Sequence, residues 1–264
     1  MRRALGGVLI GVLLVLGGSA CSPDAVDPTA ECTDQGAPPP GEPGSADVLL
    51  TVGHASGTSM LTTVLYADGW LLTLDGADAS TLMALGLPRM TPSTPAARQW
   101  QPGYLGACQQ AAVAELAAEE LAEDQDLGEP QITDQASTVV NYYGGERPTA
   151  ARAYALGHEE GTRLSPSDKA GREVLKGIID ALYEAPETGE LLDVETVQLL
   201  GSPDVDVPSD WPGPPLAEII EADAYCGVLS GPEARELFEY LATSDESIDS
   251  PRLEVMPPGL PTCT

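Results

Sequence analysis

Residues 60–74, with the sequence MLTTVLYADGWLLTL, predict a β-hairpin. Asp68 and Gly69 stand between two runs rich in leucine and β-branched residues, and both residue types tolerate the positive φ angles of a two-residue turn. Residues 60–66 and 71–74 are therefore expected to be neighbouring antiparallel strands. This hairpin indicates a sheet as the centre of the fold.

Both strands and helices are expected in the rest of the chain. Further strands are expected at 47–52, 138–143, 148–156, 194–200 and 252–256. Helical composition predicts a helix over 105–121, and Ser165 followed by Pro166 predicts the start of a helix that continues to Tyr183. Ser230 and Glu233 have capping-box spacing and predict a third helix. We therefore expect an α+β fold in which antiparallel β-hairpins form a sheet covered by about three helices.

The first 20 residues have the pattern of a signal peptide. Two arginines precede an apolar run at 4–16, which is shorter than the roughly 20 residues of a membrane-spanning helix. The sequence Gly18-Ser19-Ala20-Cys21 resembles the lipobox of bacterial lipoproteins, in which the cysteine receives a lipid and the signal is cut before it. Plain secretion, with Cys21 as an ordinary thiol, is the alternative.

This resemblance implies a chain anchored to the outer face of the cell membrane through lipid on Cys21. Residues 21–46 are rich in Pro, Gly, Ala and acids, so a disordered tether is expected there. Residues 47–264 are expected to form the α+β domain, and a break near residue 130 could divide it into two lobes.

Charge restricts the partners. The chain has 41 acidic and 12 basic residues, for a net charge of −29, and removal of a signal peptide with two arginines would take this to −31. Such a surface repels nucleic acid and anionic lipid head groups. Solubility explains the charge most simply, and a docking face for a basic protein or for cations is the alternative.

The cysteines fit an oxidising compartment. With Cys21 assigned to lipid, Cys32, Cys108, Cys226 and Cys263 remain, and four cysteines allow three pairings. The sequence alone does not choose between them, although proximity to the ends of predicted elements favours Cys226 with Cys263 and leaves Cys32 for Cys108. A metal site would need close pairs such as C-x-x-C, which the sequence lacks.

Catalytic motifs are sparse. The histidines His54 and His158 have no metal-binding spacing, so no catalytic residue, metal or cofactor is predicted. Residues 53–59 are polar and glycine-rich, which favours a connecting loop, with a ligand-binding loop as the alternative. Trp100 and Trp211 occur in proline-rich stretches, where they could be core residues or partner anchors. His54, Trp100 and Trp211 are therefore the candidate ligand or partner contacts.

Several short motifs, taken in order, resemble a group of uncharacterised secreted lipoproteins of actinomycetes. They are the Tyr66-x-Asp68-Gly69 hairpin, Tyr154-Ala155-Leu156-Gly157, Leu164-Ser165-Pro166, Trp211-Pro212, Cys226-Gly227-Val228-Leu229-Ser230-Gly231 and a final cysteine. The resemblance implies an envelope address and supports the pairing of Cys226 with Cys263, but it implies no mechanism.

Two functions follow from these patterns. The first is a non-catalytic binding or interaction module of the cell envelope, attached to the membrane and contacting an envelope protein. The alternative is an extracytoplasmic hydrolase or a substrate-binding accessory, with a site in the loops at 53–59 and 87–103.

Overall fold

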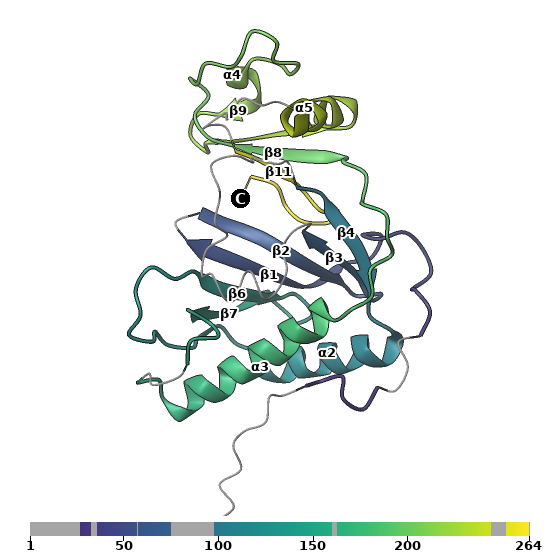
Figure 1. The fold of residues 1–264 in the computed structure, drawn as a ribbon, viewed down its shortest axis with the longest axis vertical. Helices are drawn as coiled ribbons and strands as arrows, with labels where there is room; N and C mark the ends of the chain where they lie inside the picture. Colours follow the sequence, from purple (N-terminus) through teal and green to yellow (C-terminus); the bar gives the residue numbers. More distant parts are fainter. Residues whose placement is uncertain are drawn as a thin grey trace, which may run out of the picture.

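The computed structural model of the chain describes residues 27–32, 36–56, 58–74, 98–159, 163–243 and 252–263. These residues form 11 strands and four helices, which confirms the expected α+β fold. The strands make two sheets rather than one, and helices lie on the outer side of each (Figure 1). The helices therefore do not all cover a single sheet.

Sheet A has seven strands in the order β4-β3-β2-β1-β6-β7-β5. The strands are β1 (Val48–Ser56), β2 (Thr58–Tyr66), β3 (Trp70–Leu74), β4 (Trp100–Tyr104), β5 (Gln125–Asp126), β6 (Ser137–Tyr142) and β7 (Thr149–Tyr154). The predicted hairpin is confirmed between β2 and β3. Gly69 has a φ of 97°, and its amide donates to the Tyr66 carbonyl at 3.0 Å.

The expectation of a loop at 53–59 is wrong. β1 continues to Ser56 and pairs on one side with β2, where His54 faces Met60, and on the other with β6, where His54 faces Thr138. The loop was predicted because residues 53–59 are polar and contain glycine. Pairing with a strand on both sides supplies its backbone groups with partners and keeps it extended.

Helices α2 (Ala107–Glu120) and α3 (Pro166–Tyr183) cover one face of sheet A (Figure 1). The predicted start of α3 is confirmed, because the Ser165 hydroxyl accepts from the Asp168 amide at 3.0 Å and the Asp168 carboxylate accepts from the Ser165 amide. The apolar face of α3 packs into a core that α2 and sheet A complete; it includes Val174, Leu175, Ile178 and Leu182.

Sheet B has four strands in the order β11-β8-β10-β9, and the chain enters it between Tyr183 and Thr196. Its strands are β8 (Thr196–Leu200), β9 (Ile220–Glu221), β10 (Cys226–Ser230) and β11 (Arg252–Val255). Helices α4 (Leu216–Ile219) and α5 (Pro232–Thr243) lie on its side away from sheet A (Figure 1).

Two long-range hydrogen bonds join sheet A to β11 of sheet B and to the segment that follows it. The Trp100 indole donates to the Val255 carbonyl at 2.8 Å, and the Tyr66 hydroxyl donates to the Pro258 carbonyl at 2.8 Å. Apolar side chains from both sheets and from α5 form the second core around these contacts. The C-terminal segment 256–263 is thus attached to both sheets, because the Cys226–Cys263 disulfide also fixes it to β10.

Candidate functional site

His54 lies on the helix-covered face of sheet A. Side chains alternate along a strand, so His54 shares the face of Leu50 and Val52, both in the core beneath the helices. Its Nδ1 is 3.4 Å from the Thr138 hydroxyl, and burial lowers the pKa of the imidazole below its ordinary value. The observed partner is a hydroxyl rather than a carboxylate, and the side chains of Ser56 and Ser59 lie outside the described part of the structure.

Trp100 is a buried residue of strand β4, not part of an exposed loop. Its side chain is 2 % exposed, and the indole nitrogen is occupied by the Val255 carbonyl. The interpretation of Trp100 as a core residue is therefore the one that the geometry favours. Most of the 87–103 segment, up to residue 97, lies outside the described residues.

Trp211 stabilises the connector between β8 and α4. The side chain is half-buried, its indole donates to the Pro214 carbonyl at 3.0 Å, and its ring meets Tyr240 of α5 edge-on with centroids 6.1 Å apart. His54, Trp100 and Trp211 therefore contact different residues in different elements. Trp100 and Trp211 both border the second core, whereas His54 lies on the face of sheet A that carries Leu50 and Val52, so the described residues do not form one site with all three.

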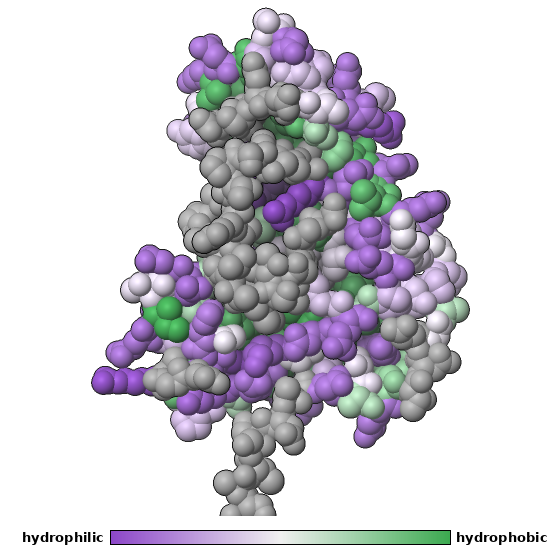
Figure 2. Space-filling view, viewed as in Figure 1, coloured by the Kyte–Doolittle hydropathy of each residue, from purple (hydrophilic) through white to green (hydrophobic). Residues whose placement is uncertain are grey.

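The described surface carries few large exposed apolar side chains. Leu191 is 41 % exposed and Tyr225 is 60 % exposed. On the face shown in Figure 2, hydrophilic residues are spread over the molecule and hydrophobic ones occur between them in small groups. Sequence reasoning missed Tyr225, because its exposure follows from a turn between two strands that were not predicted.

The Tyr225 turn has an unusual backbone conformation and is hydrogen-bonded through both backbone groups of Tyr225. Tyr225 has a φ of 52°, in the left-handed region that aromatic residues rarely adopt. Its amide donates to the Glu221 carbonyl at 2.8 Å, and its carbonyl accepts from the Gly201 amide at 2.9 Å. The next residue, Cys226, is held by the disulfide to Cys263. An aromatic side chain is thus presented to solvent from a fixed backbone.

Arg172 is a fully buried cation that sequence reasoning also missed. Its guanidinium donates to the carbonyls of Leu127, Gly128 and Tyr154 at 2.7–2.8 Å and lies 3.2 Å from a carboxylate oxygen of Glu159. These partners satisfy the donors and neutralise the charge, so Arg172 clamps α3 to the loops after β5 and β7. We assign it a structural role.

A second ionic pair lies on β11. Arg252 and Glu254 have a nitrogen–oxygen distance of 2.6 Å, and burial raises the pKa of the Glu254 carboxyl despite this partner. Among the residues that the structure describes, no group of three or more His, Cys, Asp or Glu side chains could hold a metal ion.

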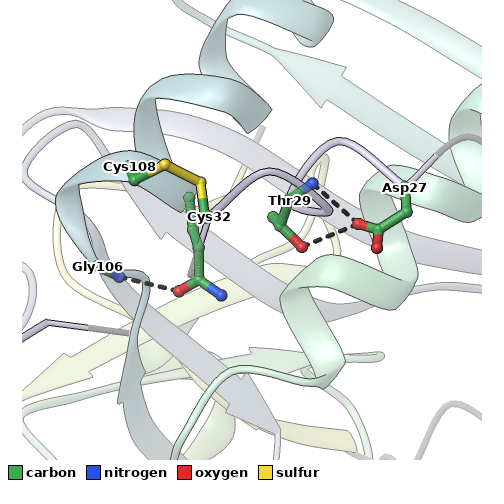
Figure 3. Close-up of a disulfide and its surroundings, with 6 residues drawn as sticks. Asp27, Thr29, Cys32, Gly106 and Cys108 are labelled. Atoms are coloured by element: carbon green, nitrogen blue, oxygen red, sulfur yellow. Dashed lines mark hydrogen bonds between the residues drawn. A yellow bond between two sulfur atoms is a disulfide. The ribbon is translucent and has the colours of Figure 1, made fainter. Parts of the chain in front are cut away.

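Both disulfides favoured by the sequence are present. Cys32 is bonded to Cys108 and Cys226 to Cys263, with Cα–Cα distances of 5.8 and 5.5 Å. Figure 3 shows the first of these where the segment around Asp27 and Thr29 meets α2. Disulfides are compatible with an extracytoplasmic location. Cys21, the predicted lipidation site, lies outside the described residues.

Much of the predicted tether is attached to the domain. Besides the disulfide at Cys32, the Tyr104 hydroxyl donates to the Gly36 carbonyl at 3.4 Å, and Ala46 packs against the second core. Residues 36–46 therefore follow the surface of sheet A before β1 begins.

In the part of the chain that is described, no helix is both long and apolar enough to cross a membrane. None of the protein-family models, curated proteins or solved structures compared with the chain matches it.

Proposed function

We propose that the protein is a membrane-anchored lipoprotein of the cell envelope that acts as a non-catalytic binding module. The address is supported by the lipobox-like residues before Cys21 and by two disulfides, and the resemblance to secreted lipoproteins of actinomycetes agrees with it. Its partner is an envelope protein. The net charge of −29 favours a partner with a basic surface.

One observation carries the binding role: the exposed Tyr225 on its strained turn. A left-handed backbone at a non-glycine residue costs on the order of 1–3 kcal/mol, and such strain clusters at functional sites. Tyrosine offers a large contact area with little conformational freedom to lose, which suits an interface. The neighbouring acids Glu221 and Asp223 are exposed and complement a basic partner.

The binding role is tested with Tyr225→Gly. Glycine accepts the observed φ of 52°, and the two backbone hydrogen bonds of residue 225 do not need the side chain. We therefore expect this variant to be at least as stable as the wild type but to lose crosslinking to its envelope partner. Leu191→Ala removes the other exposed apolar side chain and is the matched control. Unchanged crosslinking of Tyr225→Gly would refute the role of the turn.

The address is tested separately. Cys21→Ala should release the protein from the membrane fraction, whereas the neighbouring Ser22→Ala should leave it there. Mass spectrometry of the membrane-bound protein should find lipid on the peptide that begins with Cys21. Membrane retention of Cys21→Ala would contradict lipidation.

A further inference from the structure

The chain that follows the predicted lipidation site is fixed to the helix layer of the domain. Cys32 is bonded to Cys108 in the first turn of α2. Figure 3 shows Asp27 beside a second helix, and the electrostatics identify it as α3. Burial raises the pKa of the Asp180 carboxyl on α3, Lys176 lowers it, and the nearby Glu173 and Asp27 carboxylates raise it. Asp27 and Cys32 belong to one turn, in which the Ala30 amide donates to the Asp27 carbonyl and the Cys32 amide donates to the Thr29 carbonyl. The disulfide to α2 therefore holds the chain from Asp27 onward.

The short distance along the chain limits how far the lipid can be from the helices. Asp27 is six positions after Cys21 in the sequence. At most they span about 20–22 Å when fully extended. Without these attachments, the 26 residues from Cys21 to Asp47 would span about 86–94 Å. The attachment shortens the maximal reach roughly fourfold.

The shortened reach is small compared with the domain. The 217 residues from Asp47 to Cys263 have an expected radius of gyration of about 17 Å, which corresponds to a sphere with a radius of about 22 Å. A path over half of its circumference is about 69 Å long. A link of about 20–22 Å cannot run around the domain to its opposite side.

We infer that the exposed side of the α2–α3 layer faces the phospholipid bilayer, and that sheet B with the Tyr225 turn faces away from it. This orientation rests on the proposed anchoring through Cys21. Sheet B lies on the side of sheet A opposite to α2 and α3, as Figure 1 shows, so the proposed binding turn is held outward. The binding module would thus present the Tyr225 turn away from the membrane.

The negative charge of α2 determines whether the helix layer inserts into the bilayer. Glu115, Glu119 and Glu120 are exposed on α2, and anionic head groups repel them. The repulsion acts over about 8–10 Å at moderate ionic strength. The layer therefore faces the bilayer across water without inserting into it.

The orientation can be measured by energy transfer to labelled lipid. The mature chain, residues 21–264, is coupled through the Cys21 thiol to a maleimide lipid in phosphatidylcholine–phosphatidylglycerol vesicles, since the other four cysteines are paired. A fluorescent amino acid is placed at Ala118, exposed on α2, or at Tyr225, and the acceptor is on the lipid head groups. We expect stronger transfer from position 118. Equal transfer, or stronger transfer from position 225, would overturn the inference.

Removal of the disulfide is the matched control. With Cys32→Ser and Cys108→Ser, the next described attachment is at Gly36, 15 residues from Cys21, and the link lengthens to about 50–54 Å. The difference in transfer between the two positions should then shrink, and an unchanged difference would show that the disulfide does not set the orientation. Since coupling is chemical, a failure here is distinct from an absence of lipid in the native protein, which would refute only the proposed address.

Discussion

Replacement of the buried Arg172 by methionine should destabilise the fold severely. The side chain of Arg172 is fully buried and makes three hydrogen bonds to carbonyls at 2.7–2.8 Å, with a fourth contact to Glu159 at 3.2 Å. Methionine can fill the space of the aliphatic stem but donates no hydrogen bond. Several buried oxygens, one of them charged, would lose a partner.

The size of the effect follows from these contacts. A hydrogen bond to a charged group contributes about 1.5–3 kcal/mol, and such contributions do not add fully within one network. Breaking a buried ion pair from one side costs about 3–5 kcal/mol. We therefore expect the free energy of unfolding to fall by about 3–5 kcal/mol, a large part of the roughly 5–15 kcal/mol available to a folded domain.

Urea unfolding measures this loss directly, provided that the slope with denaturant is unchanged. Arg147→Met is the control, because Arg147 contacts Asp124 at a similar 3.0 Å but both side chains are more than 60 % exposed. Its midpoint should hardly move, since solvent screens such pairs. Arg172→Lys keeps the charge but not the planar fork, so it should recover only part of the stability. Similar midpoints for Arg172→Met and Arg147→Met would refute the reasoning.

Three further outcomes are expected. Burial lowers the pKa of His54 below 6.5, so the unfolded chain binds a proton more readily than the folded one, and the free energy of unfolding should fall as the pH drops through 6.5. His54→Gln should remove this contribution to the pH dependence of the free energy of unfolding between about pH 8 and about pH 5. An unchanged pH dependence would contradict the prediction. Replacing Cys226 and Cys263 by serine should reduce the free energy of unfolding by about 4 kcal/mol, because it opens a loop with a sequence separation of 37; an unchanged urea midpoint would argue against this. Gly227→Ala places a Cβ 2.2 Å from the backbone oxygen of Ile219, so it should lower the melting temperature clearly, and a wild-type melting curve would show that the strand can shift freely.

The features that the sequence predicted well depend on neighbours in the chain. The Asp68–Gly69 turn and the cap of α3 at Ser165 involve residues within three positions of each other, so their chemistry can be recognised locally. Proximity to element ends also favoured the observed cysteine pairs, although four cysteines allow three pairings.

The features that were missed depend on distant pairing. Trp100 lies in a proline-rich stretch, yet it is a strand residue because it pairs with Leu74 and because Val255 accepts from its indole. Assignment of strands to two sheets follows from the same kind of contact. The amino-acid composition of a segment does not show which distant strand it pairs with.

One missed feature did leave a signal in the sequence. Arg172 precedes Leu175 by three residues and Ile179 by seven, which puts it on the same face of a helix as these buried side chains. A cation on an apolar face must find hydrogen-bond acceptors inside the protein. The position of Arg172 therefore predicts a buried clamp, although not which carbonyls it binds.

The hydrogen bonds that Trp100 and Tyr66 of sheet A make to the C-terminal residues also constrain the order of folding. Trp100 and Val255 are 155 positions apart, and Tyr66 and Pro258 are 192 apart. Closing a loop of this length costs about 2.5 kcal/mol more in chain entropy than closing one of about 10 residues. The β2–β3 hairpin can form early, but the contacts between sheet A and residues 252–258 can form only after those residues have been synthesised. The second core can therefore be completed only near the end of synthesis, so a nascent chain that lacks residues 252–258 exposes the apolar side chains that this core buries.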